Sequence, residues 1–195
     1  MLLALAILCA LVWAGLLFCH GYFWQAGPIL QPVSTATTPA DIAPDVTVVG
    51  PARDGAESIA GAVGALWQQD DPGTLRVIVV NDRSTDGTAA LARALPDPQG
   101  RLSVLDGAPP EAGWSGKLWA VAQGVHEAER QTPQGSGYLF LTDADIIHAP
   151  AHITTLVAKA QAERLHMVSE MVELQCETLA ERALVPAFVF FFTLL

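Results

Sequence analysis

The middle of the chain alternates short β-prone runs with segments of helical periodicity, and this alternation restricts the fold more than any other feature. The β-prone runs occupy residues 46–50, 75–80, 102–105 and 138–142, and a further strand is predicted at 166–174. Helical segments occupy residues 56–69, 86–95, 116–130, 150–164 and 177–184. Apart from Arg76, the run 75–80 is continuously apolar, as in strands buried on both faces of a parallel sheet. The order predicts an α/β fold with a doubly wound, mainly parallel sheet.

Polar side chains stand where three of these strands are predicted to end. They are Arg53 and Asp54, Asn81 and Asp82, and Asp143 and Asp145. Ligands bind doubly wound sheets beyond the carboxyl ends of the strands. Residues two apart in a strand share a face, so Asp143 and Asp145 are expected to point into one pocket. There they could hold a hard divalent cation that bridges nucleotide phosphates, although the same spacing also occurs in ordinary turns.

The segment 79–88 follows the second predicted strand and precedes a helix. Ser84 or Thr85 is expected to cap this helix, and Asp86 favours the helix dipole. Capping does not require polar side chains at Asn81 and Asp82. A carboxylate at Asp82, at the carboxyl end of a strand, could accept the N–H of a uracil ring.

The segment 113–120 resembles a phosphate-binding loop superficially, but Glu111 and Leu118 stand where a Walker A motif needs glycine and Ser or Thr. A GxGxxG motif is absent from the sequence, so a dinucleotide site has no support. Lys117 is one of only two lysines and lies at a predicted helix start, where backbone N–H groups favour an anionic ligand. The alternative is a surface loop with a solvated lysine.

Composition excludes several classes of function. The chain has 195 residues, enough for one domain, and a net charge of −10, which argues against nucleic-acid binding. The sequence contains no CxxC pair and no GxSxG motif. His148 and His152 have a spacing that metal ligands use, but we expect them to be solvated.

Both ends of the chain are apolar. Residues 1–24 carry no charged side chain and predict a transmembrane anchor, with a cleaved signal peptide as the alternative. Residues 25–44 are rich in Pro, Thr and Ala and predict a linker to the α/β domain, which is placed at 45–182. Residues 183–195 form an apolar run, which is expected either to lie on a membrane or to mark a C-terminally truncated chain.

Four motifs in this order resemble glycosyltransferase family 2, whose members have the GT-A (Rossmann-like) fold. They are Val-Thr-Val-Val-Gly-Pro-Ala-Arg-Asp at 46–54, Val-Val-Asn-Asp-Arg-Ser-Thr-Asp-Gly-Thr at 79–88, Gly-Lys at 116–117 and Thr-Asp-Ala-Asp at 142–145. The apolar ends and the Trp-Ser-Gly-Lys loop are most similar to the hopene-associated glycosyltransferases of hopanoid biosynthesis.

The resemblance implies that residues 45–182 form a GT-A nucleotide-sugar-binding domain, and it implies a role for each matching residue. Asp82 would contact the base of a nucleotide sugar, and Pro51 and Asp54 would line the nucleotide pocket. Lys117 would lie near the diphosphate. Of the DxD pair, Asp145 would be the direct ligand of a divalent metal (Mg²⁺ or Mn²⁺), and Asp143 a second ligand nearer the ribose or sugar.

Two residues depart from the family pattern: Asn81 stands where an Asp is usual, and Arg83 where a Gly is common. The family's catalytic base lies well downstream of the DxD pair. Glu170, Glu173 and Glu177 lie too early for this role, so the base is expected beyond residue 195.

The resemblance implies a metal-dependent, inverting transfer of sugar from a nucleotide sugar, with UDP-sugar favoured, to a lipid acceptor that could be a hopanoid. It also implies a bacterial inner (cytoplasmic) membrane location with the catalytic domain facing the cytoplasm.

Three alternatives stay open. A GT-A-like nucleotidyltransferase would need a more glycine-rich loop at 50–55. A non-catalytic membrane scaffold would explain Asn81, and a processive polysaccharide synthase would need a downstream QxxRW-type motif and several membrane spans.

Overall fold

The computed structural model describes residues 2–19, 30–33, 44–70, 73–132 and 137–193. These residues fall into two units, one comprising residues 31–169 and the other residues 1–30 together with 170–195. The first unit contains the sheet and is the body of the domain.

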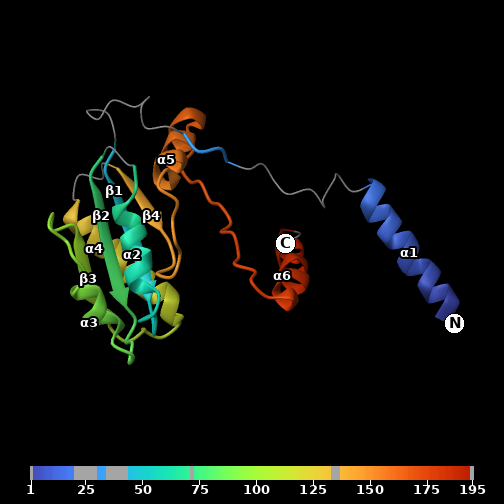
Figure 1. Ribbon diagram of the computed structural model, residues 1–195, viewed down its shortest axis with the longest axis horizontal. Helices are drawn as coiled ribbons and strands as arrows, with labels where there is room; N and C mark the ends of the chain where they lie inside the picture. Colours follow the sequence, from blue (N-terminus) through green and yellow to red (C-terminus); the bar gives the residue numbers. More distant parts are fainter. Residues whose placement is uncertain (1, 20–29, 34–43, 71–72, 133–136, 194–195) are drawn as a thin grey trace. The chain divides into compact units, whose positions relative to one another are not determined.

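Four strands form a parallel sheet in the order β3-β2-β1-β4 (Figure 1). The strands are β1 (Val46–Ala52), β2 (Leu75–Asn81), β3 (Leu102–Asp106) and β4 (Tyr138–Leu141). Val46 of β1 pairs with Leu75 on one side and with Tyr138 on the other. The predicted parallel α/β sheet is therefore confirmed, and β1 is a central strand.

Helices cover both faces of this sheet. They are α2 (Ile59–Trp67), α3 (Thr88–Arg93), α4 (Gly116–Gln131) and α5 (His152–Glu163). In Figure 1, α2 lies in front of the sheet and α4 lies behind it. Each predicted helix between 56 and 164 is present, although α3 is shorter than the predicted segment 86–95.

The two central strands are apolar because they are buried on both faces. Val48, Val77 and Val79 pack with residues of α2 in one cluster. Val49, Ile78 and Val80 pack with Ala120 and Ala128 of α4 in another. Neighbouring residues of a strand point to opposite faces, so both sets of side chains need apolar partners.

Small residues let α4 approach the sheet closely. Ala120, Gly124 and Ala128 are the buried residues of this helix and recur every four positions, which places them on one face. A Cβ atom at position 124 would overlap Cγ1 of Val49 and lie 2.8 Å from Cγ2 of Val80. Glycine is therefore required there by the distance between helix and sheet.

Both ends of the chain contain a helix. Helix α1 (Leu2–Cys19) falls within the predicted anchor at residues 1–24, but no helix in the described part of the chain is long and apolar enough to cross a membrane. The predicted transmembrane helix is therefore not found, and residues 20–24 lie outside the described residues. An α-helix of 18 residues is about 27 Å long, slightly less than the hydrocarbon core of a bilayer. Of the predicted linker 25–44, residues 30–33 and 44 are described.

Residues 166–174 form no strand, contrary to the prediction. A strand needs a hydrogen-bonded neighbour, and these residues pair with none of the strands in the described part of the chain. The following helix, α6 (Leu179–Thr193), is longer than the predicted segment 177–184 and contains Pro186. It begins with reciprocal bonds in which Glu181 N–H donates to Thr178 Oγ1 (3.2 Å) and Thr178 N–H donates to Glu181 Oε2 (2.7 Å).

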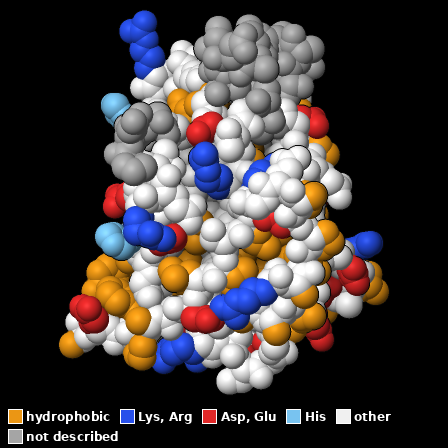
Figure 2. Space-filling view, turned by 90° about the vertical axis from the view of Figure 1, so that its left-hand side faces the viewer, with side chains coloured by type: hydrophobic (Ala, Val, Ile, Leu, Met, Phe, Trp, Pro, Cys, Tyr) orange, Lys and Arg blue, Asp and Glu red, His pale blue; other side chains and the backbone are white. Residues whose placement is uncertain are grey.

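The surface of the sheet-containing unit carries both signs of charge. Figure 2 shows acidic and basic side chains interspersed on one face. Ion pairs such as Arg76–Asp45 (3.3 Å) and Arg93–Asp106 (2.6 Å) join side chains of opposite charge on this unit.

Candidate active site

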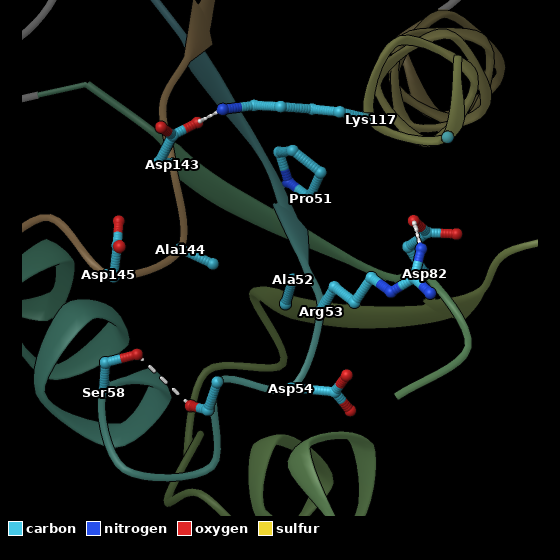
Figure 3. A pocket seen from close by; sticks show the side chains of 12 residues that line it. Pro51, Ala52, Arg53, Asp54, Ser58, Asp82, Lys117, Asp143, Ala144 and Asp145 are labelled. Carbon is cyan, nitrogen blue, oxygen red and sulfur yellow. Dashed lines mark hydrogen bonds and ion pairs between the residues drawn. The ribbon is translucent and has the colours of Figure 1, made fainter. Parts of the chain in front are cut away.

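A cavity of about 500 Å³ opens at the carboxyl ends of β1 and β2, next to the N-terminus of α4 (Figure 3). It is formed by the end of β1 and its following loop, the residue after β2, the first two residues of α4 and the turn after β4. The lining residues are Pro51, Ala52, Arg53, Asp54, Gly55, Ser58, Asp82, Gly116, Lys117, Asp143, Ala144 and Asp145. All six residues predicted to bind the nucleotide sugar or the metal are among them.

The loops after β1 and β2 are tied together by side-chain hydrogen bonds. Asp54 N–H donates to Ser84 Oγ (3.1 Å), and Thr85 N–H donates to Asp54 Oδ1 (2.8 Å). Ser84 and Thr85 were predicted to cap α3, which is wrong, because its N-terminus lies at Gly87 and has no side-chain cap. These two residues instead fix Asp54, whose φ of 48° is uncommon for a residue other than glycine.

Asn81 has a structural role that sequence reasoning missed. Its Nδ2 donates to Asp106 Oδ1 (3.0 Å) on the neighbouring strand, and its Oδ1 accepts from Ser84 N–H (3.0 Å). The hydrogen bond from Asn81 and the ion pair with Arg93 lower the pKa of Asp106. An amide at position 81 therefore satisfies both a carboxylate and a backbone N–H, which a carboxylate there would not.

Asp82 is the buried carboxylate of the cavity. Its backbone N–H donates to Ala52 O (2.8 Å), which fixes the residue beside the end of β1. Arg53 Nη1 lies 3.5 Å from Asp82 Oδ2, and Arg83 Nε lies 3.4 Å from Asp82 Oδ1. Sequence reasoning placed Arg53 at the strand end without assigning it a role, although its position next to Asp54 was an available signal.

Lys117 reaches across the cavity to the turn after β4. Its Nζ lies 2.7 Å from Asp143 Oδ1, and more than half of each side chain is exposed (Figure 3). An exposed ion pair of this kind contributes about 1 kcal/mol or less. Breaking the ion pair between Lys117 and Asp143 therefore costs little free energy, so Lys117 is available to an anionic ligand.

Asp143 and Asp145 lie in a turn and not at the end of a strand, because β4 ends at Leu141. The expectation that strand periodicity would direct both carboxylates is therefore wrong, although both line the cavity. Among the described residues, no group of three or more His, Cys, Asp or Glu side chains could hold a metal ion. Two carboxylates nevertheless fit Mg²⁺ or Mn²⁺, which complete their coordination with water and substrate phosphates.

His148 and His152 form a hydrogen-bonded pair next to this turn. His148 is buried, and its Nδ1 lies 2.8 Å from Nδ1 of His152, while its Nε2 lies 3.0 Å from Thr142 Oγ1. Thr142 Oγ1 in turn donates to Asp143 O (3.2 Å). Burial, and to a smaller extent His152, lowers the pKa of His148 to about 4. The expectation that this pair is solvated is wrong for His148.

The chain belongs to glycosyltransferase family 2. The family model described as "Glycosyl transferase family 2" matches residues 47–181, which include every residue that lines the cavity.

Two curated relatives come from Rhizobium meliloti (strain 1021). Succinoglycan biosynthesis protein ExoO is 44% identical over 66 residues, which is 34% of this chain and 19% of that protein. Succinoglycan biosynthesis protein ExoU is 38% identical over 71 residues, 36% of this chain and again 19% of that protein. The matched region thus spans about a fifth of the length of either relative.

Among solved structures, the chain is similar to mannosyltransferase PcManGT from Pyrobaculum calidifontis in complex with GDP-Man and Mn²⁺. The TM-score is 0.52 and the identity 24%, over 80% of this chain and 43% of that one. This likeness supports the predicted GT-A-like fold. The family match favours a glycosyltransferase over a nucleotidyltransferase.

Proposed function

We propose that this domain binds the donor of a metal-dependent, inverting glycosyltransferase, that the donor is a UDP-sugar, and that the acceptor is a lipid. The observation that carries the proposal is the convergence in one cavity of a buried carboxylate, a lysine at a helix start and two acidic side chains in a turn. These groups come from three segments between residues 82 and 145. Each is of the type that one part of a nucleotide sugar requires.

In this proposal, each residue contacts a different part of the donor. Asp82, at the buried end of the cavity, accepts a hydrogen bond from the base, while Pro51 and Asp54 line the nucleotide part. Lys117, one position into α4, places a cation where the leaving diphosphate gains negative charge. The first turn of α4 adds backbone N–H groups that favour the same anion.

Asp145 and Asp143 would hold a divalent ion, with Asp143 also near the ribose or sugar. When bound, the ion neutralises charge on the diphosphate. Because Lys117 neutralises Asp143 in the unliganded protein, arrival of the diphosphate would transfer the lysine to the phosphate and release the carboxylate for the ion. The exposed Asp143–Lys117 pair would therefore offer little resistance to donor binding.

The acceptor and the location are further parts of the proposal. Because of the family resemblance, a hopanoid is the first lipid acceptor to test. Because of the names of the two relatives, an intermediate of succinoglycan biosynthesis is the second acceptor to test. Nucleotide sugars are supplied in the cytoplasm, so we place the domain at the cytoplasmic face of the bacterial inner membrane. Cell fractionation with a tagged full chain tests this location.

Calorimetric titration of the full chain in mild detergent, with UDP in the presence and absence of Mn²⁺, tests donor binding. We expect binding that requires the metal. Asp145→Ala should abolish the metal-dependent part of UDP binding without changing the unfolding transition. Asp70→Asn, which changes an exposed carboxylate outside the cavity, is the matched control and should bind as the wild type does.

Two results would contradict the proposal. Unchanged UDP affinity in Asp145→Ala would remove the assignment of this residue to the metal. Failure of the folded wild-type chain to bind any nucleotide would favour the non-catalytic scaffold.

A further inference from the structure

Three hydrogen bonds connect the first residue of α5 to the acidic turn, residues 142–145. Nδ1 of His152 lies 2.8 Å from Nδ1 of His148, and Nε2 of His148 lies 3.0 Å from Thr142 Oγ1. The hydroxyl of Thr142 donates to the backbone carbonyl of Asp143 (3.2 Å). His148 is buried and does not line the cavity, so it can act on Asp143 through Thr142 and not through a ligand.

The direction of each hydrogen bond fixes where the protons lie. Thr142 has one hydroxyl proton and gives it to Asp143 O, so its oxygen must accept from Nε2–H of His148. Burial lowers the pKa of His148 to about 4, so the ring is neutral at pH 7 and its Nδ1 carries no proton. That Nδ1 therefore accepts from Nδ1–H of His152. The opposite tautomer of His148 would draw the Thr142 hydroxyl proton away from Asp143.

The start of α5 is fixed to the end of α2. Gln69, just after α2, accepts from Ile153 N–H with Oε1 (3.1 Å) and donates to Ala149 O with Nε2 (2.8 Å). Asp70 N–H donates to Pro150 O (2.8 Å). The histidine pair therefore has a fixed support, to which the acidic turn is joined by hydrogen bonds.

We infer that His148 is a positioning residue for the acidic turn and acts by donating its Nε2–H to Thr142. This inference rests on the proposed donor function. Asp143 and Asp145 are exposed, so core packing does not hold their side chains, and the backbone that carries them has to be held instead. Thr142 N–H donates to Val49 O (3.2 Å), so Thr142 joins the turn to the central strand as well as to His148.

The position of this backbone matters because two carboxylates bind a divalent ion well only when both reach it together. Groups that hold metal ligands in place typically change metal affinity about 10–100-fold when they are lost. Without the bond from His148, the Thr142 hydroxyl is free to rotate away from Asp143 O. The expected result is weaker metal-dependent binding of UDP by a domain that still folds.

Two amide variants separate this hydrogen bond from simple filling of the buried space. The amide nitrogen of glutamine can occupy the place of histidine Nε2, whereas that of asparagine occupies the place of Nδ1. His148→Gln should therefore still donate to Thr142, and His148→Asn should not. Thr142→Val removes the hydroxyl, and Thr142→Ser keeps it. Thr154→Val is the matched control, because Thr154 lies in α5 and its buried Oγ1 has no hydrogen-bond partner among the described residues.

Calorimetry of the full chain with UDP and Mn²⁺ in mild detergent compares these variants well below their unfolding transitions. Thr142→Val and His148→Asn should each bind UDP about tenfold more weakly than the wild type, and the other three variants within about twofold of it. ¹⁵N NMR of the metal-free chain at pH 7 gives a second readout that needs no ligand. The signals that disappear in His148→Gln should be those of a ring protonated on Nε2 and unprotonated on Nδ1.

The outcomes separate this inference from the donor proposal. Wild-type affinity in Thr142→Val or His148→Asn would overturn the inference and leave the donor site standing. Equal losses in His148→Gln and His148→Asn would also overturn it, because the filled space and not the hydrogen bond would then matter. A His148 proton on Nδ1 would overturn it as well. Failure of the folded wild type to bind UDP would overturn the donor proposal together with the inference.

Discussion

Replacing Gly124 with alanine should destabilise the domain, even though alanine is the better helix former. In an exposed helix this change gains up to about 1 kcal/mol. At position 124 the new methyl group would overlap Cγ1 of Val49 and lie 2.8 Å from Cγ2 of Val80, well inside the usual carbon–carbon contact distance of about 3.5–4 Å. Both valines are fully buried in central strands and have nowhere to move. Overpacking costs about 1–3 kcal/mol, and two such contacts place this site at the upper end, for a net loss of about 2 kcal/mol.

Urea denaturation of the full chain, followed by circular dichroism, measures this loss. Gly64→Ala is the matched control, because Gly64 lies inside α2 and a Cβ there has no neighbour within 4 Å. The control should be stabilised by about 0.5–1 kcal/mol. If Gly124→Ala were as stable as the wild type, or if Gly64→Ala lost as much, close approach of α4 to the sheet would not be the reason for glycine.

The remaining predictions concern the surroundings of the cavity. His148 has a pKa of about 4 when folded and about 6.5 when unfolded, so its contribution is fully present above pH 6.5 and is lost as pH falls towards 4, at about 1.4 kcal/mol per pH unit at most. Urea midpoints between pH 7.5 and 4.5 should therefore fall more steeply for the wild type than for His148→Asn, and equal slopes would refute the assignment. Asn81→Asp places a carboxylate 3.0 Å from that of Asp106 and should cost about 2 kcal/mol, with most of the loss restored by adding Asp106→Asn. A double variant no more stable than the single one would contradict this pairing. Asp54→Ala should lose about 2 kcal/mol in the same assay, and Asp54→Asn less, since asparagine still accepts a hydrogen bond and tolerates a φ of 48°. Equal losses in the two Asp54 variants would argue against this reason.

The sheet was predictable because its two central strands, β1 and β2, are buried on both faces. Val77 to Val80 alternate between the two core clusters, so every position in this run is apolar. The gathering of Asp54, Asp82 and Asp143 followed from the same reasoning, since carboxyl ends of parallel strands meet at one edge.

The structural features that could not be predicted from the sequence depend on contacts between distant segments. The partner of Asn81 is Asp106, which becomes its neighbour only through the register of β2 and β3. The contact of Arg83 with Asp82 likewise depends on the backbone conformation at Arg83, which no local pattern encodes. The run 166–174 has β-prone composition, but composition alone supplies no partner strand.

The central position of β1 also has a consequence for the order in which the chain folds. Val46 pairs with Leu75, 29 residues further along the chain, and with Tyr138, 92 residues further. Closing the longer loop costs about 1 kcal/mol more in chain entropy, and distant contacts slow folding. We therefore expect amides of β1 and β2 to gain protection from hydrogen exchange before those of β4. The half of the cavity that follows β1 and β2 would then form first, and the acidic turn after β4 that completes the cavity would dock last.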